Sequence, residues 1–411
     1  MPVDVVARGD NVGGPRCYAV GVDIITYAIP FFLLLMGVEL LVGRRRGRTV
    51  FRHHDVLTNL SLGTLQILVT VVGAVLISSL YLLLFEHRLF ELSATSWWVI
   101  VFAFFGVDFF YYWFHRASHR VMIFWATHAP HHSSEDYNLA VALRQGPLQP
   151  LASQFFYLPL ALIGVPFPLF ATMTAISLLY QFWIHTELID KLGPLELILN
   201  TPSHHRVHHG CNGTYIDKNH GGILIIWDRM FGTFVGEEAP AVYGTVSPAG
   251  TWNPLRATWL PWVDIGTKLK HSRGPVDVVR AFFGPPEWLP AGMVAGAPIA
   301  AARAKFDGRA TTKGARWAVT MFAMTLVMSV TYLVAAPLLT TWASVVAATW
   351  LMLSFGSIGA LLDGRAWAKH TEVVRLVALA PLLWFLTTSE TAHRPTTPWT
   401  KAAASVDADH R

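Results

Sequence analysis

Long apolar stretches separated by short polar ones dominate the chain, and most are long enough for a helix that crosses a lipid bilayer. Such a helix needs about 20 mostly apolar residues. The sequence predicts membrane-spanning helices over 18–42, 60–85, 97–114, 317–339, 342–362 and 373–388. A longer apolar stretch, 151–184, is interrupted at Gly164-Val165-Pro166, where we expect a hairpin of two short helices. The predicted fold class is therefore all-α, a polytopic bundle of membrane helices.

Basic residues beside the apolar stretches predict how the chain is oriented in the membrane. Four arginines follow the first predicted span, at positions 44, 45, 46 and 48. Short loops rich in arginine and lysine stay in the cytoplasm. Counting spans from there places His115 and His185 on the cytoplasmic side. We expect a multi-pass integral membrane protein, in the plasma membrane of a bacterium or the endoplasmic reticulum of a eukaryote.

The same pattern predicts how the chain is divided. It predicts N-terminal membrane anchor helices over 1–96, a cytoplasmic connecting segment over 241–316, C-terminal membrane helices over 317–390 and a polar tail over 391–411. The part between, 97–240, contains the histidine clusters described below and is the expected catalytic domain. Between the hairpin and the C-terminal spans the chain is more polar and rich in Gly, Pro and Trp. We expect this part to lie on the cytoplasmic membrane surface.

Composition excludes two classes of protein. Hydrophobic residues make up 53% of the chain and charged residues 14%, whereas soluble proteins carry about 25% charged residues. A soluble globular enzyme is therefore not expected. The net charge of +5 comes from basic residues that gather beside apolar stretches, which does not predict a nucleic-acid partner. The sequence leaves the oligomeric state open.

Histidine is the unusual component of this apolar chain. There are 18 histidines, and most lie between His115 and His220. They form three clusters: His115-x-x-x-His119, His128-x-x-His131-His132 and His205-x-x-His208-His209. Residues three and four apart share one face of a helix, so we expect each cluster to aim its imidazoles at one point. Because histidine is the commonest metal-ligand side chain, the clusters predict a metal site.

The number of histidines predicts two metal ions, since a single zinc ion takes three or four protein ligands. His185 follows the predicted hairpin and is expected to join them, whereas His204 and His220 are expected to lie outside the ligand set. The predicted metal ligands are His115, His119, His128, His131, His132, His185, His205, His208 and His209. Nitrogen ligands suit Fe, Zn, Cu or Ni, so spacing leaves the metal open. Arg116 follows His115 where a hydrolytic His-Glu-x-x-His site would have Glu.

Three polar residues are candidates for orienting the ligand histidines. Asp108 lies in an apolar span two turns before His115 on the same helix face. A carboxylate at membrane depth is costly unless it has a partner, so we expect it to accept the free ring N–H of a ligand histidine. Asp136 and Asn138, just after the second cluster, could act in the same way or be ordinary capping and loop residues.

The cluster order resembles that of the fatty acid hydroxylase and sterol desaturase superfamily. Longer strings resemble its ether-lipid-cleaving branch: DFFYYWFHR from Asp108, HHSSEDYNL from His131, YQFWIHTE from Tyr180, LGPLELILNTPSHHRVHHG from Leu192 and IIWDRMFGTF from Ile225. The resemblance is dense over about residues 97–235. It implies an integral membrane enzyme that holds two Fe ions, activates O2 and takes a lipid substrate from the bilayer.

For that branch the resemblance implies hydroxylation of the carbon next to an ether oxygen. An alkylglycerol-type lipid is then cleaved to a fatty aldehyde and an alcohol, with tetrahydrobiopterin or another electron donor. This chain has Arg120 directly after His119, where the animal enzymes have Glu, so the donor stays open.

Two alternatives remain. The same metal site could hydroxylate or desaturate a sterol, carotenoid or fatty acyl chain without cleaving an ether. A membrane metal transporter is a more remote alternative, because the histidine clusters lie at span ends on one side, whereas transport sites usually lie near the bilayer midplane.

Overall fold

The computed structural model describes residues 16–294 and 304–389, which form helices and loops with two isolated β-bridges. The predicted all-α class is confirmed for these residues. The chain divides into two compact units, Met1–Arg309 and Ala310–Arg411. The polar tail predicted over 391–411 lies outside the described residues.

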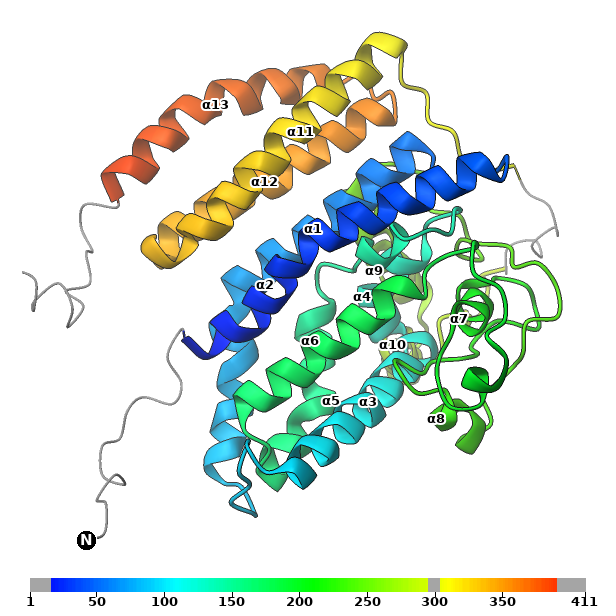
Figure 1. Ribbon diagram of the computed structural model, residues 1–411. Coiled ribbons are helices and arrows are strands. Elements are labelled where there is room, and N and C mark those ends of the chain that lie inside the picture. The colour runs from blue at the N-terminus through cyan, green and yellow to red at the C-terminus, as the bar shows by residue number, and fades with distance from the viewer. Residues whose placement is uncertain (1–15, 295–303, 390–411) are drawn as a thin grey trace, which may run out of the picture. The chain divides into compact units, whose positions relative to one another are not determined.

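The first unit contains ten α-helices in its described part (Figure 1). They are α1 (Arg16–Arg45), α2 (His53–Glu86), α3 (Trp97–Arg120), α4 (Met122–His132), α5 (Gln149–Ile163), α6 (Phe167–Trp183), α7 (Pro202–His209), α8 (Ile226–Met230), α9 (Pro254–His271) and α10 (Pro275–Phe283). The described part of the second unit contains α11 (Thr312–Ala335), α12 (Thr341–Leu362) and α13 (Ala368–Ser389), and α12 packs against both other helices.

The predicted helical hairpin is confirmed as α5 and α6. Gly164 ends α5 in the left-handed region, at φ 112°, and a Cβ there would collide with the carbonyl oxygen of Phe90. Glycine is favoured at such a position because it has no Cβ. Pro166 then precedes α6, where its fixed φ suits the start of a helix. The turn therefore follows from residues that the sequence shows plainly.

A core of apolar side chains joins the hairpin to α2 and α3. Tyr81 of α2 stacks on Phe170 of α6 with ring centroids 4.7 Å apart, and its hydroxyl donates to the carbonyl oxygen of Val165. Val99 and Ala103 of α3 are buried in the same cluster. This packing fixes α3, which carries the first histidine cluster at its C-terminal end.

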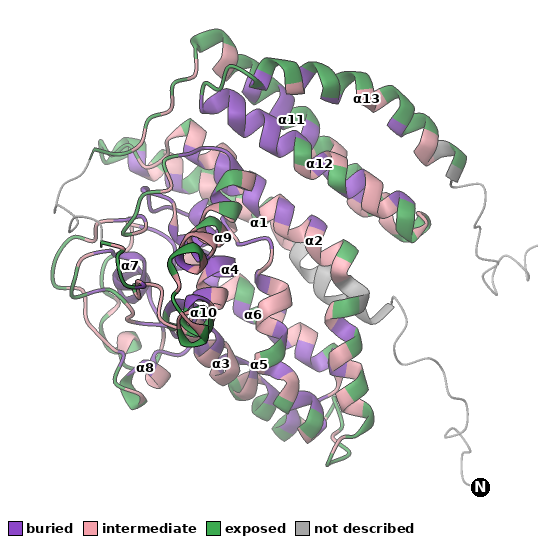
Figure 2. Ribbon diagram, turned by 180° about the vertical axis from the view of Figure 1, so that it is seen from behind, coloured by how far each residue is buried: buried purple, intermediate pink, exposed green. Residues whose placement is uncertain are grey.

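The structure confirms a multi-pass membrane protein. Among the described helices, four are long and apolar enough to cross a bilayer, and they contain His53–Gly73, Trp97–Arg120, Thr312–Leu338 and Thr341–Leu362. Exposed side chains run along α11 and α13, whereas α7 is buried throughout (Figure 2). Apolar side chains on the outside of a spanning helix face lipid, so their exposure needs no protein partner.

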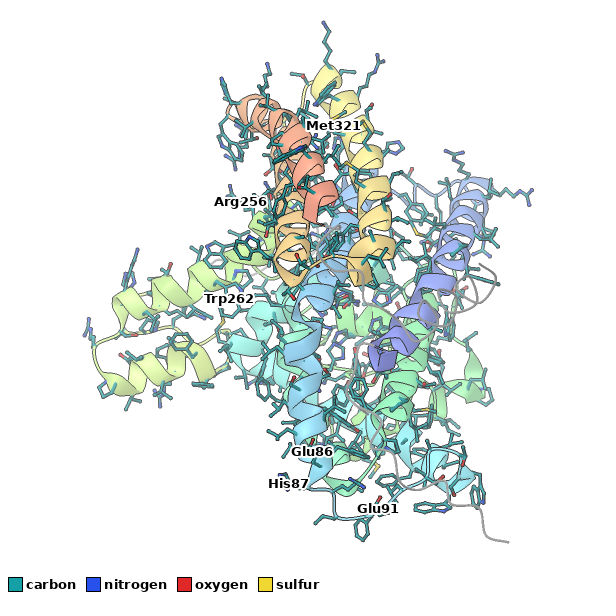
Figure 3. The ribbon with its side chains drawn as sticks, turned by 90° about the vertical axis from the view of Figure 1, so that its left-hand side faces the viewer. Glu86, His87, Glu91, Arg256, Trp262 and Met321 are labelled. Carbon is teal, nitrogen blue, oxygen red and sulfur yellow. The ribbon has the colours of Figure 1, made fainter. Side chains whose placement is uncertain are left out.

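The connecting segment contributes a helical hairpin, α9 and α10, that extends to one side of α2 (Figure 3). It packs on α4 through Ile265, which lies in a buried cluster with Met122 and Ala126. The ammonium group of the buried Lys268 donates to the carbonyl oxygen of Pro286 (2.6 Å). The hairpin therefore supports the helix that carries the second histidine cluster.

Candidate metal centre

The structure brings all nine predicted ligand histidines together in two buried groups. Within each group, one ring nitrogen from every member lies within 4.8 Å of the others. The first group is His115, His119, His128, His132 and His208, and the second group is His131, His185, His205 and His209. No carboxylate or cysteine of the described residues belongs to either group. Each group has enough donors for one ion.

The second and third histidine clusters, which have three members each, are both divided between the two groups. This corrects the expectation that each cluster aims its imidazoles at one point. In α4, His128 and His132 belong to the first group and His131 to the second. In α7 the assignment is reversed, because His205 and His209 belong to the second group and His208 to the first. Residues four apart differ by only about 40° around a helix, whereas adjacent residues differ by about 100°. The i,i+4 pairs therefore stay together and the remaining member faces the other group.

Hydrogen bonds fix the ring orientation in the first group. The Nδ1–H of His115 donates to the carbonyl oxygen of His220 (2.8 Å), and that of His208 donates to the carbonyl oxygen of Lys218 (2.9 Å). The Nδ1–H of His128 donates to Oε1 of Gln149 (2.7 Å). Because Nδ1 carries the hydrogen in each case, Nε2 presents a lone pair, as a metal-binding imidazole requires.

The second group has equivalent supports on other elements. The Nδ1–H of His131 donates to the carbonyl oxygen of Arg144 (2.8 Å). The Nδ1–H of His185 donates to the carbonyl oxygen of Gln181 (2.7 Å), one turn earlier in its own segment. The Nε2 atoms of His185 and His205 then face each other at 3.1 Å.

Close approach of bare Nε2 atoms is itself evidence for metal binding. The Nε2 atoms of His115 and His128 lie 3.1 Å apart, and those of His128 and His132 lie 3.0 Å apart. Two nitrogen ligands of one ion lie about 3.0–3.4 Å apart, given metal–nitrogen bonds of about 2.1 Å. The Nε2 atoms of His119, His208 and His209 have no hydrogen-bond partner among the described residues. Buried polar atoms of this kind are rare unless an ion or water supplies the partner.

Burial keeps these imidazoles neutral. It lowers the pKa of His128 and the pKa of His185 to about 4. Burial and then the neighbouring imidazoles lower the pKa of His132 and the pKa of His209 well below the ordinary value. A protonated imidazole cannot bind a metal ion, so burial prepares both groups for binding at neutral pH.

A strained loop over 217–222 supplies the carbonyl groups that hold the first group. Asp217 and Asn219 both have positive φ, at 57° and 55°. The side-chain amide of Asn219 donates to the carbonyl oxygens of His204 (3.0 Å) and Val235 (2.7 Å). A Cβ on Gly222 would lie 2.8 Å from Cδ1 of Tyr111. Such strained backbone persists where surrounding contacts determine it, often at functional sites.

Asp108 holds the segment directly after this loop and not a histidine, which differs from its predicted role. Its carboxylate accepts hydrogen bonds from the backbone N–H groups of Ile223 (2.7 Å) and Leu224 (3.1 Å). It also accepts one from the indole N–H of Trp227 (2.9 Å). The buried carboxylate therefore acts on His115 only through the loop that contains His220.

Asp136 and Asn138 also have partners other than histidine. Asp136 forms ion pairs with Arg52 and Lys305, both at 2.6 Å. The amide group of Asn138 donates to the carbonyl oxygen of Val50 (2.9 Å). Both residues join the loop after α4 to distant parts of the first unit. These contacts hold the loop after α4 in place and do not orient a histidine of either group.

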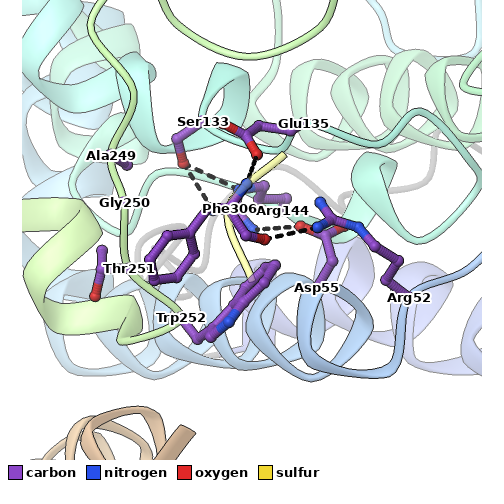
Figure 4. A pocket seen from close by; sticks show the side chains of 10 residues that line it. All are labelled: Arg52, Asp55, Ser133, Glu135, Arg144, Ala249, Gly250, Thr251, Trp252 and Phe306. Atoms are coloured by element: carbon purple, nitrogen blue, oxygen red, sulfur yellow. Dashed lines mark hydrogen bonds and ion pairs between the residues drawn. The ribbon is translucent and has the colours of Figure 1, made fainter. Parts of the chain in front are cut away.

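A buried ion pair anchors the residue that supports His131. The Nη1 atom of Arg144 lies 3.5 Å from Oδ1 of Asp55 in α2. The same guanidinium donates to Oδ1 of Asn59 (2.7 Å). Figure 4 shows this pair in a small pocket together with Trp252. Sequence reasoning missed Arg144 and Gln149 because both lie in loops or at a helix start, far from any histidine spacing.

His220 and Arg120 complete the surroundings of the first group. His220, expected to lie outside the ligand set, is fully buried and belongs to neither group. Arg120, where the resemblance would place Glu, forms ion pairs with Asp217 (2.5 Å) and Glu287 (3.2 Å). The position after His119 therefore carries a cation that is neutralised by two neighbouring carboxylates.

Comparisons with known proteins agree with this geometry. Residues 100–233 match the fatty acid hydroxylase family. Over 370 residues the chain is 40% identical to alkylglycerol monooxygenase of Homo sapiens, covering 88% of this chain and 83% of that enzyme. It is 38% identical over 365 residues to alkylglycerol monooxygenase of Danio rerio, covering 86% of this chain and 81% of that enzyme.

A more distant relative matches about a third of the chain. Ornithine lipid hydroxylase OlsE of Rhizobium tropici is 31% identical over 134 residues, which is 32% of this chain and 40% of that protein. No solved structure matches the chain. Identity at this level over most of both chains, together with the two buried histidine groups, shows that the chain belongs to the alkylglycerol monooxygenase family of membrane oxidoreductases.

Proposed function

We propose that this chain is a di-iron monooxygenase that cleaves ether lipids by hydroxylating the carbon next to the ether oxygen. One observation carries the proposal: the nine histidines of two buried groups converge in a chain that is 40% identical to an alkylglycerol monooxygenase. All nine are the proposed ligands. O2 and a lipid are the expected substrates of such an enzyme.

The donor set fits two iron ions. Imidazole nitrogen suits ferrous iron, and neither group contains the carboxylate that a hydrolytic zinc site would use. When bound, the two ions supply the reduction of O2 that hydroxylation requires. The protein holds the ions, orients the lipid and excludes water from them.

Hydroxylation explains ether cleavage without hydrolytic residues. One oxygen atom of O2 enters the C–H bond next to the ether oxygen, and the other leaves as water after taking up two electrons from a donor and two protons. The product is a hemiacetal, which breaks its C–O bond to give a fatty aldehyde and a free alcohol. The chain therefore needs no activated nucleophile, in agreement with the absence of a carboxylate from both groups.

An apolar wall beside the first group supports an alkyl substrate. The rings of Phe114 and Phe124 each contact Phe156, with centroids 5.6 and 5.4 Å apart. The ring of Tyr111 lies 5.2 Å from that of His115. These aromatic rings give the first group an apolar side, which suits an alkyl chain.

Contacts of the basic segment after α1 support a metal centre on the cytoplasmic side. The guanidinium of Arg46 donates to the carbonyl oxygen of Leu188 (2.9 Å), and that of Arg48 donates to the carbonyl oxygen of Glu187 (3.2 Å). Both acceptors follow His185 closely. Arginines beside a span stay in the cytoplasm, so the histidine groups would lie there as well.

The test is an assay of anaerobically purified, iron-loaded protein with a 1-O-alkylglycerol in detergent. We expect O2-dependent release of fatty aldehyde, with electrons from tetrahydrobiopterin or from another reductant, and no release by the His131→Ala variant. A hydroxylated lipid without aldehyde would instead support a hydroxylase like the Rhizobium tropici relative. Protein that binds iron but consumes no O2 with ether, acyl or sterol lipids would contradict the monooxygenase proposal.

A further inference from the structure

The short helix α10 carries an apolar stripe that faces away from the rest of the first unit. Val276, Val279 and Phe283 are 61%, 57% and 61% exposed. Positions i, i+3 and i+7 share one face of a helix, so these three side chains form a single stripe. On the opposite face Ala281 is fully buried. The helix is therefore apolar on both sides, and a contiguous exposed apolar stripe usually marks an interaction surface.

Basic residues border the stripe. Arg280 is exposed next to it, and Lys270, His271 and Arg273 are exposed at the turn between α9 and α10. Asp277 is the one carboxylate of α10, and its Oδ2 atom already accepts a hydrogen bond from the backbone N–H of Arg273 (3.0 Å). An apolar stripe flanked by Arg and Lys is typical of a helix that lies in the interface of a phospholipid bilayer, with its cations at the phosphates.

Two contacts anchor the end of α10 where α3 leaves the bilayer. The backbone N–H of Met122, just after α3, donates to the carbonyl oxygen of Gly284 at the end of α10 (2.9 Å). Arg120, the last residue of α3, forms an ion pair with Glu287 (3.2 Å). Because α3 is long and apolar enough to cross the bilayer, these contacts place the end of α10 close to the membrane surface.

Within the first unit, α10 lies on the bilayer side of α9. The bilayer extends from the histidine groups toward the turn between α2 and α3, because α3 crosses it between Trp97 and His115. Figures 1 and 3 show α10 on the side of α9 that is nearer this turn, where Figure 3 labels His87 and Glu91. Both helices run across the direction of α2 and not along it (Figure 3). The hairpin therefore runs along the membrane surface, with α10 nearer the lipid.

We propose that α10 is a membrane-surface helix that inserts Val276, Val279 and Phe283 into the bilayer, with Arg280 at the phosphate groups. The occupant of the stripe is a phospholipid surface and not a further protein. The proposal goes beyond the proposed reaction and does not depend on bound ions. Since α9 and α10 both pack on α4, contact with the bilayer also holds the helix with the second histidine cluster at the membrane surface.

The test measures the depth of single labels in the full chain, reconstituted into vesicles of phosphatidylcholine and phosphatidylglycerol. The two native cysteines are replaced by serine, and a fluorescent label is attached at Val276→Cys, Val279→Cys or Phe283→Cys. Val246→Cys is the matched control, because Val246 is 53% exposed but lies in a loop. Quenching by lipids brominated at different depths, and by iodide in the water, locates each label.

The three labels on α10 should lie about 5–10 Å below the phosphate level and be shielded from iodide. The label at Val246→Cys should be quenched by iodide and not by brominated lipid. Arg280→Glu should make the Val279→Cys label shallower, since it places a carboxylate beside the phosphates. Labels on α10 that iodide quenches as fully as the control label, or that neither quencher reaches because protein covers the stripe, would overturn the proposal.

A second measurement needs no substitution and decides the question if the cysteine variants do not fold. The wild-type chain in the same vesicles is cross-linked with a phospholipid that carries a photoactivatable diazirine in its acyl chain. Cross-linked peptides from α3 are the positive control, because α3 crosses the bilayer. Cross-links within residues 275–283 would support the proposal. Cross-links in α3 without any in α10 would overturn it.

Discussion

The two histidine groups use the same side chain but are held in different ways. In the first group, His115 and His208 depend on carbonyl groups of the strained loop over 217–222. In the second group, His131 depends on Arg144, which is anchored to α2, and His185 depends on its own segment. Local changes should therefore affect one ion without the other.

The largest effect that separates the groups is expected from removing one ligand of each. His119→Ala should weaken the first ion and His185→Ala the second, each leaving about one ion per chain. Turnover should fall by more than about 1,000-fold in both variants, because the two ions act as a unit. Metal analysis with X-ray absorption distinguishes the ions, and loss of both from each variant would contradict two independent groups.

A smaller effect is expected from removing the Asp108 carboxylate, which holds the segment directly after the loop over 217–222. Asp108→Ala leaves two backbone N–H groups and the indole N–H of Trp227 without their acceptor. We expect the affinity for the first ion to fall by about 10- to 100-fold and the second ion to be retained. Thermal unfolding should also occur at lower temperature, since buried unpaired donors cost about 1–3 kcal/mol each.

Asp108→Asn is the matched variant for that measurement. It keeps one oxygen acceptor and nearly the same volume, so its affinity for the first ion should fall less than that of Asp108→Ala. If both variants retained the first ion as tightly as the wild type, the loop would not determine that site.

A change of about tenfold is expected from Gln149→Leu. The substitution removes the acceptor of the His128 Nδ1–H but keeps the side-chain volume roughly constant. The first ion should bind about tenfold more weakly in chelator competition, and the second should be unaffected. Gln154→Leu, in the same helix and outside both groups, is the control and should bind both ions normally.

The smallest effect is expected from pH, which should act on both groups alike. His128 of the first group and His185 of the second both have a pKa of about 4 in the folded, metal-free protein. An unfolded histidine titrates near 6.5. Between these values the unfolded chain binds more protons, so the stability of the metal-free protein is complete above about 6.5 and is lost as the pH falls toward 4. Thermal unfolding from pH 7.5 to 4.5 measures this loss, and equal stability at both ends would contradict it.

Helical spacing identified the histidines that come together in the folded chain because it reports on local geometry. The nine predicted histidines all lie in the two groups, and the turn at Gly164 follows from its missing Cβ. The division of each three-histidine cluster also follows from helix geometry. Adjacent residues such as His131 and His132 point about 100° apart, so they cannot face the same group.

The parts that could not be predicted depend on contacts between distant segments. Asp108 has its partners at 223, 224 and 227, which no periodicity relates to position 108. His220 follows a residue with positive φ and precedes two glycines, a pattern typical of an exposed turn, yet the loop folds inward onto α3. Only the tertiary packing shows which residues Asp108 binds and that the loop with His220 is buried.

The division of α7 between the groups has a mechanical consequence. This helix spans only Pro202–His209, and it carries His208 for one group and His205 and His209 for the other. A rigid displacement of α7 moves ligands of both groups by the same amount. The division in α4 is the opposite one, and the ring of His132 stacks on that of His209 with centroids 4.4 Å apart. The separation between the two groups therefore depends on how two short helices pack through the histidines themselves.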